Sequence, residues 1–282
     1  MDYVLPGEVV SDALNAAVKK AGLPAPDMFI RGALSGVFLG YATSLVFVAL
    51  SQGLPALVGA IIFPVGFVIL VLLGLELATG NFALLPAALI DQRISAKAML
   101  RNWTWVYVGN LFGSVLYALL FYAAITSFGA NNGAALGDQV RKIAQAKTLG
   151  FAALGISGWG TAFVRAMLCN WMVTVGTMLA FISRSTIGKV AAMWLPITIF
   201  FAHGYEHSIV NMFVIPAGIF LGAPISLADW WWWNQIPVTF GNIVAGALFT
   251  GIAFWYTYAR KQETAAVQPV QSRAGVAAAA GD

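Results

Sequence analysis

The chain has two histidines, His203 and His207, and both lie with Glu206 in the apolar segment AHGYEHSIVNMF. An imidazole can donate or accept a hydrogen bond and changes charge near neutral pH, so this segment could lend a proton to a small anion. The same letters also form H-x-x-E-H, a pattern in which two histidines on one helix face hold a catalytic zinc ion. Zinc would need a third ligand, which only Glu76 could supply from another apolar segment. A membrane zinc hydrolase is therefore kept as an alternative interpretation, although the glycine inside the motif disfavours a continuous helix.

The composition indicates a membrane protein. Charged residues make up 9% of the chain and hydrophobic residues 60%, with a mean hydropathy of +0.82, whereas soluble domains average about 25% charged residues. The net charge of +4 fits cationic loops retained on one side of a membrane and predicts no nucleic-acid partner. Because a membrane helix needs about 20 apolar residues, we predict an all-α fold with six spans, at about 31–51, 55–90, 103–127, 161–182, 190–221 and 235–258.

The second and fifth predicted spans share a motif, G-x-E-x4-N-x4-P, which begins at Gly74 in one and at Gly204 in the other. Each of these spans is too long for one straight crossing and contains a glycine and a carboxylate, which is typical of a helix broken within the membrane. The third and sixth spans also match, through VGNLFGSVLY and FGNIVAGALF. Three spans per half is an odd number, so the halves must enter the membrane from opposite sides. The sequence therefore predicts a 3+3 inverted repeat with two broken helices, whose new N-termini favour an anion.

Two carboxylates, Glu76 and Glu206, lie in the middle of the long spans. A charge at the bilayer centre costs at least about 2.5–3.5 kcal/mol, so each must be paired, protonated or hydrogen-bonded. Because their positions repeat, we expect them to hold the backbone amides of their own broken loops. The predicted loop-shaping residues are Glu76, Glu206, Asn81 and Asn211. His207 breaks the repeat, since Leu77 occupies the matching position, and is therefore the better candidate for lining a pore.

The charge distribution predicts the orientation of the chain. With both termini in the cytoplasm, the inner side collects eleven Lys and Arg residues and the outer side four. The run WWWW then falls in the loop before the sixth span, where tryptophan anchors the membrane interface. We expect a multi-pass protein of the inner (plasma) membrane. Its predicted parts are an amphipathic helix at 1–28, a transport domain at 29–260 with halves at about 29–127 and 161–258, and a disordered cytoplasmic tail at 261–282.

Three segments together resemble the formate–nitrite transporter family. GYEHSIVNMF resembles that family's fifth-span loop, GLELATGN its second-span loop, and FVRAMLCNW a motif of its fourth span, in the right order and over about residues 5–260. The resemblance implies an aquaporin-like protomer in a lipid membrane, a homopentamer, and passage of small monovalent anions. It implies a channel or transporter and not an enzyme, with no cofactor and no bound metal.

The resemblance also assigns roles to single residues. It implies that His207 is the pore histidine, Thr79 its partner from the opposite loop, and Asn170 a polar neighbour. The constriction residues that it implies are Phe200 and Phe67, and Lys147 matches a lysine of the vestibule. Ala78 departs from the family, because many members have phenylalanine there. His203 stands where a small residue is usual and adds a second group that could titrate.

Formate is the first choice of substrate, because a small monocarboxylate needs only this site. Nitrite, hydrosulfide, acetate and lactate remain alternatives within the same family. A bare anion cannot cheaply cross an apolar constriction, so we expect it to pass as the neutral acid with a hydrogen bond or proton from His207. A water channel of aquaporin type is disfavoured, because neither broken loop contains Asn-Pro-Ala.

Overall fold

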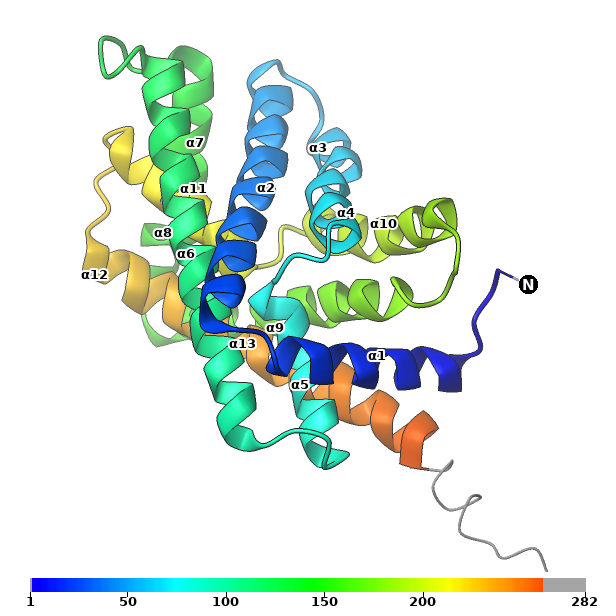
Figure 1. The fold of residues 1–282 in the computed structure, drawn as a ribbon. Coiled ribbons are helices and arrows are strands. Elements are labelled where there is room, and N and C mark those ends of the chain that lie inside the picture. The colour runs from blue at the N-terminus through cyan, green and yellow to red at the C-terminus, as the bar shows by residue number, and fades with distance from the viewer. Residues whose placement is uncertain (1, 261–282) are drawn as a thin grey trace, which may run out of the picture.

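The computed structural model describes residues 2–260. In this part of the chain the regular secondary structure is helical, apart from one β-bridge between Tyr3 and Ser183 (Figure 1). Residue 1 and the predicted tail at 261–282 lie outside the described residues. Four helical stretches are long and apolar enough to span a membrane. They are α2 (Ala25–Ser51), α6 (Ala96–Thr126), α9 (Ile156–Leu179) and the continuous stretch Leu227–Ala259.

Shorter apolar helices lie between the long ones, at the two predicted broken spans. The first set consists of α3 (Ala56–Ile62) with α4 (Pro64–Leu72), followed by α5 (Ala78–Ile90). The second set consists of α10 (Thr186–Ala202) and α11 (Ser208–Phe220). When the two copies of the repeated motif are aligned, α10 begins where α3 begins and ends where α4 ends. In the same alignment, α11 begins and ends where α5 does.

A glycine is the second residue of each interruption. Gly74 and Gly204 both adopt φ +64°, a left-handed conformation that other residues rarely enter. The chain then runs extended to Leu77 and His207, whose φ angles are −120° and −112°. The interruptions occupy residues 73–77 and 203–207, so the glycine in the motif marks the point where each helix stops.

The last long stretch corrects one expectation from the sequence. It consists of α12 (Leu227–Trp230), η1 (Trp231–Gln235), α13 (Ile236–Val244), η2 (Ala245–Ile252) and η3 (Trp255–Ala259). The run WWWW was predicted to be a loop but is helical, because Ser226 and Asp229 form a capping box that starts the helix before it. Trp230 is buried, Trp231 and Trp232 are exposed, and Trp233 is half-buried.

Three further helices flank the apolar bundle. The helix α1 (Pro6–Ala21) falls in the predicted amphipathic segment and buries one face, with Val10, Leu14 and Ala17, against the ends of α5 and α9. The helix α7 (Ala134–Lys147) and the short α8 (Leu149–Ala152) were not predicted and follow α6. We refer to the side of the molecule that carries α1 as the α1 side and to that of α7 as the α7 side.

The long helices approach closely where small residues face each other. The helices α2 and α6 run side by side (Figure 1), and a Cβ added at Gly113 would lie 1.8 Å from the carbonyl oxygen of Ala33. A Cβ at Gly36 would lie 2.4 Å from that of Asn110. Glycine at these contacts allows backbones to touch, as in many membrane helix pairs. The close packing fixes α6, and with it the asparagines that hold the first broken loop.

Candidate functional site

The two helix breaks meet at one buried hydrogen bond between Thr79 and His207. Thr79 Oγ1, in the first turn of α5, lies 3.1 Å from His207 Nε2, just before α11. The backbone N–H of Val210 donates to His207 Nδ1 at 3.2 Å. Because Nδ1 is an acceptor, the proton of the neutral ring lies on Nε2 and is donated to the threonine hydroxyl. Both side chains are at most 2% exposed, so this contact joins two distant parts of the chain in the core.

Asn170, on α9, fixes the threonine from a third direction. Its Nδ2 donates to the carbonyl oxygen of Thr79 at 3.1 Å and to that of Asn242 at 2.6 Å. Its Oδ1 is buried without a hydrogen-bond partner in the described chain. The structure therefore brings together the three polar residues that the sequence predicted at the pore.

Aromatic rings lie beside this polar contact. The ring of Phe200 stacks on His207 with centroids 5.8 Å apart, at an interplanar angle of 23°. Phe63, which the sequence did not single out, packs edge-on against Phe200 at 5.8 Å. Phe67 is buried and lines a cavity on the α1 side, whereas Ala78 is fully buried at the start of α5. Phe200 thus places apolar surface against His207, and Phe67 places it in the cavity beside the first break.

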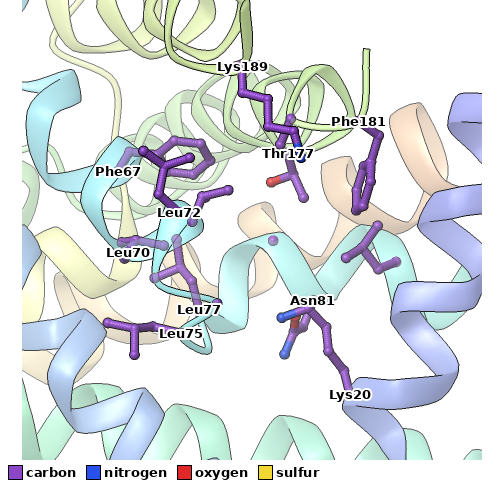
Figure 2. Close-up of a pocket in the computed structure, with 15 residues that line it drawn as sticks. Lys20, Phe67, Leu70, Leu72, Leu75, Leu77, Asn81, Thr177, Phe181 and Lys189 are labelled. Atoms are coloured by element: carbon purple, nitrogen blue, oxygen red, sulfur yellow. The ribbon is translucent and has the colours of Figure 1, made fainter. Parts of the chain in front are cut away.

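The cavity on the α1 side has a volume of about 240 Å³ (Figure 2). Its walls come from α4, α5, the first broken loop, the end of α9 and the first turn of α10. Most of its lining is apolar, and the polar groups are those of Lys20, Asn81, Thr177 and Lys189. It is an open approach to the first helix break, with room for a small anion and several waters.

Each buried carboxylate is part of a network with one lysine and two asparagines. Glu76 accepts from Lys20 Nζ at 2.8 Å and from Asn81 Nδ2 at 2.8 Å, and Asn81 also donates to Asn102. The contacts of the second network have the same pattern: Lys147 to Glu206 at 2.9 Å, Asn211 to Glu206 at 2.7 Å, and Asn211 to Asn234 at 2.9 Å. Both glutamates are at most 2% exposed, and the lysines neutralise them.

The loop amides are held by other residues than the sequence suggested. Asn110 Oδ1 accepts from the N–H of Ala78 at 3.0 Å, and Asn242 Oδ1 accepts from that of Ser208 at 2.9 Å. Their Nδ2 groups donate to the carbonyls of Glu76 and Glu206. The expectation that the carboxylates hold these amides is wrong, because lysine and asparagine side chains occupy the carboxylate oxygens. The sequence did contain a signal for this role, because Asn110 and Asn242 are the asparagines repeated in VGNLFGSVLY and FGNIVAGALF.

Two predicted residues lie outside the central contact. Lys147 is ion-paired with Glu206, and its side chain is 19% exposed, so its charge is not free. His203 is exposed, lies 2.8 Å from the carbonyl oxygen of Ile199, and stacks on Tyr205. Within residues 2–260, no three His, Cys, Asp or Glu residues are close enough to hold a metal ion. Lys20, Asn102 and Asn234 complete the networks and were missed.

The fold and this site define an all-helical integral membrane protein whose two interrupted helices meet at a polar centre. The model of one family, described as "Formate/nitrite transporter", matches residues 7–256. The chain therefore belongs to the formate/nitrite transporter family. Members of this family transport ions and are not enzymes, so the zinc hydrolase interpretation of the two histidines is wrong.

Relatives of known name support the same assignment. A probable formate transporter of Methanothermobacter thermautotrophicus is 35% identical over 92% of this chain and 86% of its own. The formate channel FocA of Escherichia coli K12 is 31% identical over 93% and 97%. Among solved structures, an FNT family ion channel matches with a TM-score of 0.77 at 28% identity, covering 89% of this chain and 98% of its own. A pentameric formate channel with formate bound matches at 0.68 and 29%, covering 83% and 98%.

Proposed function

We propose that this protein is a membrane channel for small monovalent anions and that formate is its substrate. One observation carries the proposal: Thr79 and His207 join the two helix breaks by a buried hydrogen bond at 3.1 Å. The family and the names of the relatives support formate. Nitrite is the alternative substrate, because the family description names both anions.

The proposed topology has six spans in a 3+3 inverted repeat. In it, α3 with α4 and α5 form one broken span, and α10 with α11 form the other. Support comes from the bounds of these helices, which match between the halves in the register of the repeated motif. We place the α1 side in the cytoplasm, because the predicted inner loops carry most of the Lys and Arg residues. The transport domain is residues 29–260, in the inner membrane.

The proposed assembly is a homopentamer with one pore in each protomer. A structural neighbour described as a pentameric formate channel supports this. The mass of the protein in detergent, corrected for bound detergent, is expected to be about five times that of the 29.9 kDa chain. The mass of a monomer or a tetramer would contradict the assembly.

In the proposed mechanism, the anion replaces the Thr79 hydroxyl as the acceptor of the His207 Nε2–H. Phe200 and Phe67 exclude water around it, which strengthens the hydrogen bond and makes a bare charge costly. The hydrogen bond from Nε2–H lowers that cost, and a proton that the anion brings in from the aqueous side, as the neutral acid, lowers it further. Protonating the ring at Nδ1 would displace the amide of Val210, so charging the histidine and capping α11 compete. Passage is therefore expected to depend on pH.

Flux into proteoliposomes tests this function. Formate and nitrite are compared side by side at about pH 5 and pH 7, on either side of the usual titration range of histidine. The expected result is formate flux that changes with pH, and His207→Asn is expected to retain flux but lose most of the pH response. His203→Ala is the matched control and is expected to keep the response. Nitrite flux without formate flux would make the protein a nitrite transporter, and flux of neither anion would sink the proposal.

A further inference from the structure

Two lysines face the α1-side cavity, and only one of them has its charge neutralised. Lys20 is ion-paired with Glu76 at 2.8 Å, and its side chain is 22% exposed. Lys189, in the first turn of α10, is half-buried and makes no ion pair within residues 2–260. Figure 2 shows Lys189 reaching from α10 beside Thr177, with Lys20 and Asn81 across the cavity. The free positive charge of the cavity therefore belongs to Lys189.

The other polar groups of the cavity are already engaged. Asn81 Nδ2 donates to Glu76 and Asn102, and the Thr177 hydroxyl donates to the carbonyl oxygen of Val173. Asp2 lies near the start of α10, but its carboxylate accepts hydrogen bonds from Ser183, Arg184 and Ser185 and makes no ion pair with Lys189. An anion in this cavity thus meets one cationic donor without a competing carboxylate, between walls that are mostly apolar.

The opposite half of the molecule has no equivalent of this lysine. The matching position of the first half, in the register that aligns Gly74 with Gly204, is Gly59, and a Cβ there would lie 2.7 Å from the Val46 side chain. Lys20 and Lys147, by contrast, are both paired with a buried glutamate. The duplicated lysines complete the two networks, whereas Lys189 occurs once and beside open space.

We propose that Lys189 is the residue that binds the monovalent anion in the α1-side cavity before it reaches Thr79 and His207. In this assignment Lys20 is a positioning residue, which holds Glu76 and the first broken loop. The inference rests on the proposed function for the identity of the anion. It gives the α1 side a cationic capture site that has no counterpart at the matching position of the first half, Gly59.

The first test measures formate flux in proteoliposomes sorted for one orientation, with formate supplied from each side in turn. Lys189→Gln is expected to raise the half-saturating formate concentration about tenfold from the α1 side, the scale of one hydrogen bond to a charged group. From the α7 side this concentration is expected to stay unchanged while the maximal rate falls about tenfold, because passive flux requires the same ratio of maximal rate to half-saturating concentration on both sides. The maximal rate from the α1 side is expected to stay unchanged. Lys189→Arg is expected to restore capture. Lys97→Gln, which removes an exposed cation on α6 outside the cavity, is the matched control and is expected to change nothing.

A second measurement separates this inference from the proposed function. Exchange broadening of the 13C signal of labelled formate reports binding to the detergent-solubilised pentamer or protomer, whether or not the protein transports formate. Wild-type protein and Lys97→Gln are expected to broaden the signal, and Lys189→Gln much less. Equal broadening by wild type and Lys189→Gln would overturn the inference, as would a larger loss of capture in Lys20→Gln than in Lys189→Gln. Broadening without flux would overturn the channel function and keep the binding site.

Discussion

The two helix breaks are held by the same contacts, yet the residues that meet at the centre differ. In both halves a lysine and two asparagines surround a buried glutamate. In both, a further asparagine holds the first amide of the second half-helix. At the centre, the first half contributes Thr79 where the second has Ile209, and the second contributes His207 where the first has Leu77.

This difference distinguishes residues that support the fold from residues that could contact the anion. Residues that occur in both halves satisfy backbone groups and buried charges, which every interrupted membrane helix must do. Residues that occur once, such as Thr79, His207 and Lys189, lie where the two halves leave space or face each other. Asymmetry at matched positions is therefore a guide to function in this fold, and it can be tested by changing both members of a pair.

The largest effect is expected for the asparagines that hold the broken loops. Asn110→Ala leaves the N–H of Ala78 and the carbonyls of Glu76 and Gly32 without their partner. Unmet buried groups cost about 1–3 kcal/mol each, so a loss of about 3 kcal/mol or more in unfolding free energy is expected. Thermal unfolding in detergent measures it.

The matched change, Asn242→Ala, removes the same three kinds of contact in the second half. The loss of unfolding free energy is expected to equal that of Asn110→Ala. Asn15→Ala, at an exposed asparagine of α1, is the control and is expected to have little effect. If only one of the two buried changes destabilises the protein, the halves are not equivalent scaffolds.

A smaller effect is expected for the paired carboxylates. Glu76→Gln and Glu206→Gln each leave a lysine without its counter-ion and give the neighbouring asparagine a weaker acceptor. These lysine side chains are about one-fifth exposed, so water solvates them in part. We therefore expect each substitution to lower the unfolding free energy by about 1–3 kcal/mol. The proportion of assembled protein on size exclusion reports it, with Asp27→Asn at an exposed ion pair as the control. If Glu206→Gln assembles well but has an altered anion preference, Glu206 takes part in anion selection and does not only support the loop.

The glycine and glutamate motif was enough to predict where the helices break. A glycine that can enter a left-handed conformation, followed by a carboxylate in an apolar span, leaves few alternatives to an interruption. The pairing of Thr79 with His207 came instead from the resemblance to a family. The two residues lie in opposite halves of the chain, and no local pattern encodes their contact.

The lysine partners of the carboxylates were beyond the reach of sequence patterns, whereas Asn81 and Asn211 were part of the repeated motif. Lys20 and Lys147 lie on α1 and α7, which are polar helices outside the predicted spans, and each meets a glutamate that is distant along the chain. Only the packing of α1 and α7 over the helix breaks brings them there. The helical tryptophan run was missed for a different reason, since interfacial composition suggested a loop while the capping box at Ser226 started a helix.

The cap of the second half-helix gives a smaller and more specific effect. His207→Leu makes the second break resemble the first, where Leu77 provides no side-chain cap. Losing the contact to the Val210 N–H is expected to contribute about 1 kcal/mol to the loss of unfolding free energy, beside the loss of the hydrogen bond to Thr79, which is absent from both His207 variants compared here. His207→Asn is expected to recover most of this, because asparagine caps helices well, although it cannot titrate. Equal unfolding temperatures for the leucine and asparagine variants would show that the cap contributes nothing.

The smallest effect concerns the different ways in which α1 and α7 are held. Residues 127–133 connect α7 to α6, and residues 148 onward continue it into α8. The N-terminal end of α1 is held by Asp2, which accepts hydrogen bonds from the Ser183 hydroxyl and from the Arg184 and Ser185 amides. The Ser183 hydroxyl, followed by the Ser185 amide, lowers the pKa of the Asp2 carboxyl below its usual 3.8. A carboxyl whose pKa is lowered by folding stabilises the folded state above the unfolded pKa and loses that contribution as pH falls through the folded value.

Protection of the Arg184 and Ser185 amides from hydrogen exchange, relative to the intrinsic rate at each pH, measures this contact. In the wild type, protection is expected to be constant from neutral pH to about pH 4 and to fall below it. Asp2→Asn is expected to show the low level at every pH, while Glu8→Gln, at an exposed acid of α1, follows the wild type. Protection that is equal in Asp2→Asn and wild type at neutral pH would mean that the Asp2 carboxylate contributes nothing here, and that the backbone hydrogen bonds of Val4 to Ile182 and of Arg184 to Asp2 hold this end of α1.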